Sequence, residues 1–304
     1  AQMRSAWTST AKQAASPAQK RAADAAEAPF LLIEPLRKAA PLVFASPHSG
    51  RRYPREMLQA AQVGLHSLRR GEDAYVDELF AGAAKHGASV LCANIARSFI
   101  DLNRDPYELD PDMFADALPA HANTGSARVQ AGLGAIPKIA GDGRTIYRGK
   151  LSLADAEQRI AAVYQPYHGA LARLIAEARD AFGCAVLIDC HSMPSCARGP
   201  HAPDIVLGDR YGAACHPSVI SLVEASLRRL GYRVARNAPF AGGHTTQNYG
   251  RPADRVHGLQ IEVSRGLYLD EHNLERSSGF TKVKADMSRL AETLAAAELH
   301  RSLA

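Results

Sequence analysis

Two apolar runs, each followed by a His-Ser pair, constrain the fold of this chain most strongly. The first, residues 42–46, leads into Pro47-His48-Ser49-Gly50, and the second, residues 184–189, leads through Cys190 into His191-Ser192. Short apolar runs that end abruptly at turn-forming residues predict buried strands. Ligands of open α/β sheets bind at the carboxyl edge of the strands. We therefore expect His48 and His191 to be presented alike, at one sheet edge and in one shared site.

Strand-like and helix-like patterns alternate along the rest of the chain. Further strands are expected at residues 89–95, 98–104, 204–207, 232–236 and, as the last strand, 258–265. Helices are expected at residues 54–61, 72–87, 153–178 with a kink or a new start at Pro166, 217–230 and 280–303. Such alternation predicts an α/β fold with a mostly parallel or mixed central sheet flanked by helices on both faces.

Two stretches lack this alternation. Residues 105–150 are rich in Gly, Pro, Asp and Ala without a sustained period, and we expect an active-site cover or insertion there. Residues 1–28 are rich in Ala, Ser, Gln and Lys, and we expect a flexible tail. Residues 29–304 then form a single catalytic domain, for which the 46% hydrophobic content supplies a large core.

Composition narrows the class of partner. The net charge of +5 is scattered along the chain, which argues against a nucleic-acid partner, and no apolar stretch is long enough to cross a bilayer. The five cysteines are odd in number and lack CxxC spacing, which favours the reducing cytoplasm. We expect a small-molecule substrate, with neither nucleic acid nor membrane as a partner.

A metal centre is the hypothesis that best joins the two histidines. Hydrolytic zinc sites commonly take three protein ligands from His and carboxylate side chains and leave one position for water. His48, His191 and one carboxylate would supply them, and Asp73 is favoured over Glu72 because the helical pattern that follows leaves Asp73 at the helix cap. Taken singly, each residue has an ordinary alternative, a hydrogen-bonded histidine or a capping acid.

Glu262 interrupts the apolar run 259–263, and a buried carboxylate is costly unless it has a partner or a role. Beside a metal-activated water it would serve as general base and then as proton donor to the leaving amine. The alternative is a structural salt bridge to Arg265 or another arginine. We expect Asp189 to point to the opposite strand face from His191 and to have a structural or supporting role.

Three arginines lie at or near predicted strand ends. A guanidinium group can hold a carboxylate through two hydrogen bonds or polarise a scissile carbonyl. We assign Arg97 to catalysis and Arg104 and Arg265 to substrate binding, with Asn103 adding an amide donor beside Arg104. The alternative is that these are ordinary solvated arginines.

Residues 242–246, Gly-Gly-His-Thr-Thr, combine glycines that allow close backbone approach with hydroxyl and imidazole groups. His244 and Thr245 are therefore further candidates for binding a substrate anion, although glycine pairs also form ordinary turns. Ser49 and Ser192, next to the two histidines, raise a serine hydrolase alternative, but neither lies in a GxSxG elbow.

Several blocks, in order between about residues 40 and 272, together resemble the N-formylglutamate amidohydrolase family. The blocks are Ser46-Pro47-His48-Ser49-Gly50, residues 73–77, Asp101-Leu102-Asn103-Arg104, Gln165-Pro166-Tyr167-His168, Asp189-Cys190-His191-Ser192, Gly242-Gly243-His244-Thr245-Thr246, Tyr249-Gly250-Arg251-Pro252 and Leu259-Gln260-Ile261-Glu262.

The resemblance implies a zinc-exopeptidase-like fold, related to zinc carboxypeptidases and aspartoacylases, and one Zn²⁺ ion. It implies metal ligands at His48, Asp73 or Glu72, and His191, a base at Glu262, and a carboxylate-binding pair at Asn103 and Arg104. The implied reaction is hydrolysis of N-formyl-L-glutamate to formate and L-glutamate, a late step of histidine degradation. Unlike carboxypeptidases, this chain has no acid in a His-x-x-Glu arrangement after His48. Two alternatives stay open, a zinc hydrolase of another N-acyl amino acid or short peptide, and a non-catalytic binding protein on the same fold.

Overall fold

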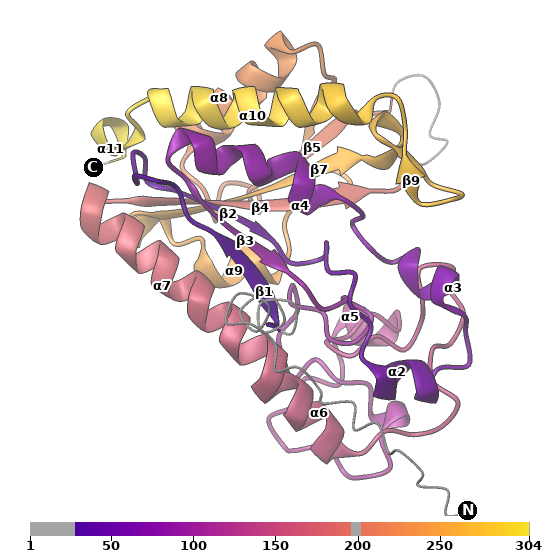
Figure 1. The fold of residues 1–304 in the computed structure, drawn as a ribbon. Helices are drawn as coiled ribbons and strands as arrows, with labels where there is room; N and C mark the ends of the chain where they lie inside the picture. The colour runs from indigo at the N-terminus through magenta and orange to yellow at the C-terminus, as the bar shows by residue number, and fades with distance from the viewer. Residues whose placement is uncertain (1–27, 196–201, 304) are drawn as a thin grey trace, which may run out of the picture.

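The structure is a computed structural model that describes residues 28–195 and 202–303, so the expected tail lies outside the described residues except for residue 28. A seven-stranded sheet in the order β1-β3-β2-β4-β7-β5-β6 forms its centre (Figure 1). The strands are β1 (Phe30–Ile33), β2 (Leu42–Ser46), β3 (Ser89–Ala93), β4 (Ala185–Met193), β5 (Ile205–Gly208), β6 (Val234–Arg236) and β7 (Val256–Ser264).

The sheet is mixed, as the sequence predicts. Its four central strands, β3, β2, β4 and β7, run parallel to one another. At one end β1 pairs antiparallel with β3, and at the other β5 pairs antiparallel with β7 and parallel with β6. The parallel strands therefore present their carboxyl ends at one edge, where His48 follows β2.

Helices cover both faces of the sheet, which confirms the α/β class (Figure 1). On one face α10 (Phe280–Ala296) packs against α4 (Val76–Phe80), the 3₁₀ helix η1 (Ala81–His86) and α8 (Pro217–Arg229). On the other face α7 (Gln165–Phe182) packs against β2, β3 and β4, and α9 (His244–Tyr249) packs against β4 and β7. The shorter helices are α2 (Arg55–Ala60), α3 (Leu65–Arg69), α5 (Ala127–Gln130), α6 (Leu153–Arg159) and α11 (Leu299–Ser302).

The two faces of β4 explain how a buried strand carries polar side chains. Val186, Ile188 and Cys190 enter the core beneath α4, α8 and α10, whereas Ala185 and Leu187 enter the core beneath α7. Because side chains alternate along a strand, Asp189 and His191 continue the second set beyond the end of its apolar part. The neighbouring strand β7 repeats this arrangement with Gln260 and Glu262.

Pro166 lies in a helix that continues directly from the turns before it, where the sequence predicts a kink or a new start. The helix α6 continues into a π-helical turn, η3 (Ile160–Tyr164), and Pro166 lies in the first turn of α7. Tyr164 and Gln165 keep helical backbone angles, and the wider π-helical turn directly precedes the proline, whose missing N–H cannot bond to that turn.

Residues 98–104 do not form the expected strand. They fold as consecutive turns, in which the Asp101 amide donates to the carbonyl of Ala135 (2.7 Å) and the Phe99 carbonyl accepts from Arg159 (2.9 Å). Their backbone groups are thus satisfied by distant segments rather than by a sheet ladder. The stretch 105–150 contains only two short helical turns, α5 and η2 (Pro111–Met113), within its irregular path.

Four further expectations need correction. His191 lies inside β4 rather than after it, and residues 241–250 contain the helix α9. The hairpin of β8 (Leu269–Asp270) and β9 (Glu275–Arg276) follows the strand that we expected to be last, and β1 precedes the strand that we expected to be first. The strands β1, β8 and β9 are too short to show a clear period in the sequence.

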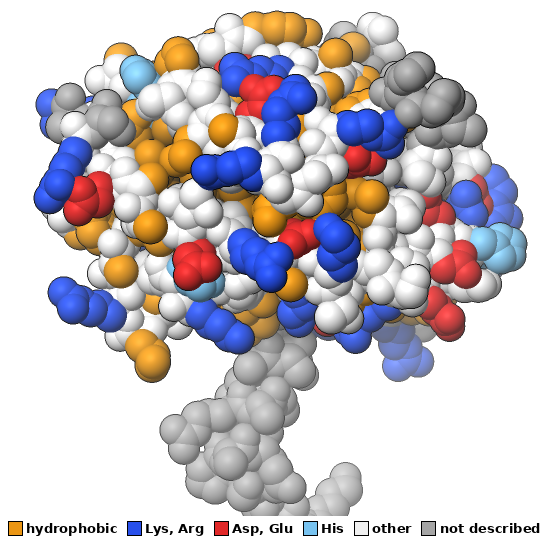
Figure 2. All heavy atoms as spheres, turned by 90° about the horizontal axis from the view of Figure 1, so that it is seen from above, with side chains coloured by type: hydrophobic (Ala, Val, Ile, Leu, Met, Phe, Trp, Pro, Cys, Tyr) orange, Lys and Arg blue, Asp and Glu red, His pale blue; other side chains and the backbone are white. Residues whose placement is uncertain are grey.

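No helix in the described part of the chain is long and apolar enough to cross a membrane. On the face formed by α8 and α10, basic side chains are interspersed with acidic and apolar ones (Figure 2).

Candidate metal centre

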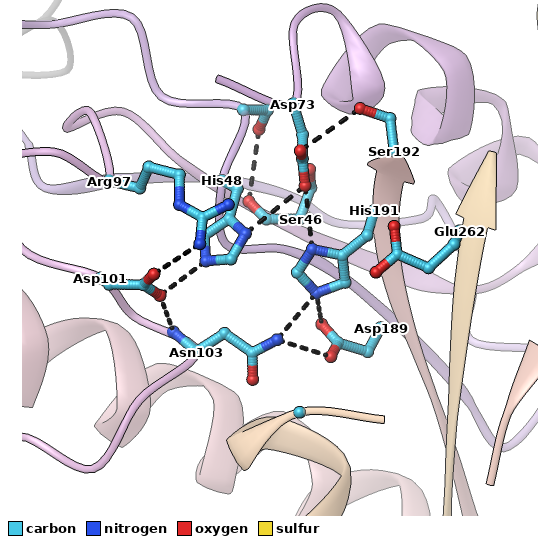
Figure 3. A network of polar contacts seen from close by, with 12 residues as sticks. Ser46, His48, Asp73, Arg97, Asp101, Asn103, Asp189, His191, Ser192 and Glu262 are labelled. Atoms are coloured by element: carbon cyan, nitrogen blue, oxygen red, sulfur yellow. Dashed lines mark hydrogen bonds and ion pairs between the residues drawn. The ribbon is translucent and has the colours of Figure 1, made fainter. Parts of the chain in front are cut away.

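His48, Asp73 and His191 converge at the sheet edge. One ligand atom from each residue lies within 4.8 Å of the other two, and their exposed fractions are only 3%, 2% and 2%. His48 comes from the turn after β2, His191 from β4, and Asp73 from the turn that precedes α4 (Figure 3). The Asp73 amide donates to the His48 carbonyl at 3.0 Å, so the two backbones are joined directly.

The geometry also separates Asp73 from Glu72. Glu72 accepts from the Tyr53 hydroxyl (2.7 Å) and from Arg69 (3.3 Å), away from both histidines. The expected place of Asp73 at the helix cap is wrong, because Tyr75 is the N-cap of α4 and adopts a left-handed conformation with φ of 63°. The side chain of Asp73 is therefore not used for capping and faces the cluster.

Gly50 allows the turn that carries His48 to lie against the chain leaving β3. A Cβ atom at this position would stand 2.1 Å from the Ile95 carbonyl oxygen. Only glycine permits an approach of this kind between two backbones.

Both histidines direct Nδ1 toward the same carboxylate oxygen. His48 Nε2 donates to Asp101 Oδ1 at 2.7 Å, and its Nδ1 lies 3.4 Å from Asp73 Oδ2 without a hydrogen-bond partner. His191 Nε2 lies 3.0 Å from Asp189 Oδ1, and its Nδ1 donates to Asp73 Oδ2 at 2.9 Å. Each histidine thus has a carboxylate beside Nε2 and directs Nδ1 to Asp73. A carboxylate beside the ring nitrogen that does not bind the metal is typical of metal-binding histidines.

Asp189 thus lies beside His191, and the expectation that it points to the opposite face is wrong. Residues two apart on a strand share a face, and Asp189 and His191 are two apart on β4. Asp189 is fully buried, and the Asn103 amide nitrogen lies 3.4 Å from its Oδ2 and 3.0 Å from His191 Nε2.

Burial, hydrogen bonds and neighbouring charges shift the pKa values of the cluster residues. Burial acts to raise the pKa of Asp73, but the hydrogen bonds with His191 and His48 hold that pKa well below its ordinary value. Burial acts to lower the pKa of His191, but Asp189 and Asp73 raise it well above its ordinary value. The cluster therefore stabilises positive charge between the histidines and Asp73.

Glu262 lies across the β4–β7 pair from His191, in register with it. Its carboxylate points toward His191 (Figure 3) and borders a cavity of about 520 Å³ that His48, Asp73 and His191 also line. Burial raises the pKa of Glu262 to about 7. Among the described residues Glu262 forms no salt bridge, because Arg265 pairs with Asp73 instead (3.0 Å).

Gln260 holds one oxygen of Glu262. Its Nε2 donates to Glu262 Oε1 at 2.8 Å, and its Oε1 accepts from the Gly243 amide at 2.8 Å. These two bonds fix the orientation of the Gln260 amide, which in turn orients the carboxylate.

Arg97, Arg104 and Arg265 all line the cavity, but with different partners. Arg97 donates to Asp101 Oδ2 (2.6 Å), the acid that also holds His48. Arg265 donates to Asp73 and to Ser192. Arg104 is held by backbone carbonyls, with Nε donating to Leu133 (2.9 Å) and an amino group to Asn103 (2.7 Å).

The structure separates the two candidates of the Gly-Gly-His-Thr-Thr run from the first cavity. The Thr245 amide donates to Asn103 Oδ1 (2.7 Å), and Thr245 lines neither cavity described here. His244 lines a second cavity of about 610 Å³, which also contacts Asn103 and Arg104. Thr245 therefore orients the Asn103 amide, and His244 faces the neighbouring space.

The two serines next to the histidines are held by other partners. Ser49 Oγ donates to the Ser46 carbonyl, and Ser192 Oγ donates to Asp73. Neither hydroxyl donates to a histidine, so neither of these two serines forms the serine–histidine pair that a serine hydrolase requires.

Sequence reasoning missed several residues that support the site. Asp101, the partner of His48, lies in the turns that we expected to be a strand. The Tyr164 hydroxyl donates to the Arg104 carbonyl (2.8 Å), and His168 Nε2 donates to the Leu102 carbonyl (2.9 Å). Burial lowers the pKa of His168 to about 4, so the ring is neutral near pH 7. Tyr164 and His168 are four residues apart, a spacing that places them on one face of a helix and could have indicated a shared contact.

Comparisons with known proteins identify the family to which the chain is similar. A family model described as N-formylglutamate amidohydrolase matches residues 40–269. The N-formylglutamate deformylases of Pseudomonas aeruginosa and Pseudomonas putida are 33% and 32% identical to the chain over 77% and 76% of its length, and over 84% and 82% of theirs.

Two solved structures extend the comparison. The crystal structure of N-formylglutamate amidohydrolase from Ralstonia eutropha JMP134 is 38% identical with a TM-score of 0.83, and the match covers 88% of this chain and 98% of that one. A gene product of Agrobacterium tumefaciens has a TM-score of 0.62 at 16% identity, with 92% and 96% covered, and shares the fold.

Proposed function

Because the chain belongs to the N-formylglutamate amidohydrolase family and is a hydrolase acting on an amide bond, we propose that its substrate is N-formyl-L-glutamate. The products would be formate and L-glutamate. The names of the chain's relatives support this choice of substrate. The observation that carries the proposal is the convergence of two Nδ1 atoms on Asp73 beside the free oxygen of Glu262. On the family resemblance alone, we place this reaction in histidine degradation.

We propose a Zn²⁺ ion held by His48 Nδ1, His191 Nδ1 and Asp73 Oδ2. The fit rests on the buried His48 Nδ1, which has no hydrogen-bond partner and faces a carboxylate oxygen at 3.4 Å. Because Asp101 accepts only, it keeps the ring proton on Nε2, which leaves the Nδ1 lone pair free for a cation. When bound, zinc would supply a Lewis acid that polarises the formyl carbonyl and lowers the pKa of water.

Glu262 is the proposed general base. Its carboxylate takes a proton from the attacking water while the C–O bond to the formyl carbon forms. The same group then returns the proton to the amine nitrogen as the C–N bond breaks, so that formate and the free amine leave. Gln260 holds Oε1, which leaves Oε2 for this proton transfer.

Arg97 and the Asn103–Arg104 pair are proposed to act on the substrate. Arg97, anchored on Asp101, would polarise the carbonyl oxygen from the side of His48. Arg104 is held by two backbone carbonyls, so its guanidinium is already oriented before a carboxylate binds. Arg265 lines the same cavity, but its bonds to Asp73 and Ser192 favour a role in orienting the ligand carboxylate.

A substrate panel tests the proposal. Purified protein would be assayed with N-formyl-L-glutamate, N-acetyl-L-aspartate and short peptides at matched concentrations. We expect the highest kcat/KM for N-formyl-L-glutamate, with formate and glutamate released in equal amounts. A higher kcat/KM for an acetylated or peptidyl substrate would overturn the substrate assignment and favour the corresponding amidohydrolase or peptidase.

A further inference from the structure

N-formyl-L-glutamate carries two carboxylates, and the cavity must accommodate both. The basic groups nearest the metal ligands are already paired, Arg97 with Asp101 (2.6 Å) and Arg265 with Asp73 (3.0 Å). The Arg104 guanidinium lies 4.0 Å from Asp101 Oδ2, whereas the Arg97 guanidinium lies 2.6 Å from the same oxygen. One oriented arginine does not neutralise two carboxylates, so a second cation is needed on the outer side of the cavity.

Arg128 lies where such a cation is needed. It belongs to α5, within the irregular stretch 105–150, and it lines both the first and the second cavity, as Arg104 does. Its side chain is exposed, and among the described residues no carboxylate forms an ion pair with it. The positive charge of Arg128 is therefore available to a ligand.

Leu133 ties Arg128 to Arg104. The Leu133 amide donates to the Arg128 carbonyl at 2.8 Å, and the Leu133 carbonyl accepts from Arg104 Nε at 2.9 Å. One residue thus links the backbone of α5 to the guanidinium of Arg104. The α5 turn is itself closed by Ser126, whose hydroxyl accepts from the Val129 amide (3.1 Å).

The two arginines repel each other in the absence of an anion. Burial lowers the pKa of Arg104, and the charges of Arg97 and Arg128 lower it further, against the attraction of Asp101. A carboxylate bound between Arg104 and Arg128 would relieve this repulsion.

The anion belongs on the side of the first cavity. The second cavity contains Asp105 and Glu108 beside Arg210 and Arg251, so its charge alone does not decide where the anion lies. The first cavity contains the metal cluster and Glu262, at which the amide must react. The outer carboxylate therefore lies at the boundary, between Arg104 and Arg128.

We infer that Arg128 binds the side-chain carboxylate of the substrate and so sets the preference for acidic over neutral N-acyl amino acids. This assignment rests on the proposed function, since it requires the formyl group to react at the metal cluster. The irregular stretch 105–150 would then serve to place the Arg128 guanidinium at the outer side of the first cavity.

The test compares Arg128→Gln with the native enzyme on two substrates, N-formyl-L-glutamate and N-formyl-L-glutamine, which differ only in the side-chain charge. We expect Arg128→Gln to lower kcat/KM for N-formyl-L-glutamate about 10- to 100-fold, the range for losing a charge-assisted hydrogen bond, mainly through KM. The value for N-formyl-L-glutamine should stay within about twofold. Arg128→Lys should retain part of the preference.

Arg148→Gln is the matched control, because Arg148 lies in the same stretch, is exposed and lines neither cavity. It should leave both substrates unchanged. An equal loss on both substrates in Arg128→Gln, or no loss on either, would overturn the assignment of Arg128. A native enzyme that does not hydrolyse N-formyl-L-glutamate would overturn the proposed function itself.

Discussion

The metal cluster and the substrate arm, residues 102–104 with 127–133, are built by different means. In the cluster, His191 and Glu262 stand on two adjacent parallel strands in register, so the sheet fixes their spacing. In the arm, Asn103, Arg104 and Arg128 stand on turns that are held by single hydrogen bonds from η3, α7, α9 and one another. The sheet therefore fixes His191 and Glu262, two of the groups proposed for chemistry, whereas turns alone fix the groups proposed for substrate choice.

This difference predicts two classes of variant. Changes in the cluster should reduce kcat or metal content, and changes in the arm should raise KM or alter specificity. A cluster variant that changed only KM, or an arm variant that lowered kcat or metal content, would contradict this division.

The largest expected effect is that of Glu262→Gln. Removing the base while keeping the shape of the side chain should lower kcat by at least about 100-fold. Metal content, measured by elemental analysis, should stay at the native level because Glu262 is not a proposed ligand. Activity within a few-fold of native would contradict the assigned role, and loss of metal would indicate that Glu262 is a ligand instead.

Asp101→Asn and Asp189→Asn come next. Each replaces the carboxylate behind one histidine ring with an amide, and outer partners of this kind typically contribute 10- to 100-fold in metal affinity. We expect a loss in that range in competition with a chromophoric chelator. Asp204→Asn serves as control, since Asp204 pairs with the exposed Arg233 away from the site. Unchanged affinity in both site variants would show that the carboxylates do not orient the rings.

The smallest expected effect is that of Tyr164→Phe. The change removes the hydroxyl that donates to the Arg104 carbonyl, a neutral hydrogen bond worth about 0.5–1.5 kcal/mol. We expect KM for N-formyl-L-glutamate to rise about 2- to 12-fold at nearly constant kcat. Tyr211→Phe, on an exposed tyrosine, should have no effect. A fall in kcat with unchanged KM would place Tyr164 with the cluster rather than the arm.

The parts predicted from sequence are those that regular elements carry. The meeting of His48, His191 and Glu262 in one cavity could be predicted because each interrupts or ends an apolar run, and such runs indicate strands. Asp73 was chosen correctly over Glu72 as the member of the cluster, although the helix cap invoked for it is formed by Tyr75.

The parts that were missed depend on contacts between turns. Asp101 stands in turns whose sequence predicts a strand, and Arg128 stands in a stretch without a period. Hydrogen bonds to Ala135 and His48 position Asp101, and one to Leu133 ties the backbone of Arg128. Local sequence carries no signal for such long-range pairs. The strand expected at residues 98–104 was wrong for the same reason, because its apolar alternation served turns that pack against α6 and the 105–150 stretch.

The metal content of the native protein tests the central claim most directly. The protein would be purified without a polyhistidine tag, analysed for divalent metals, and assayed on N-formyl-L-glutamate before and after chelation and after addition of Zn²⁺. We predict one equivalent of divalent metal per chain, loss of activity on chelation and recovery with zinc. Full activity without stoichiometric metal would contradict the assignment of His48, Asp73 and His191 as a catalytic metal centre.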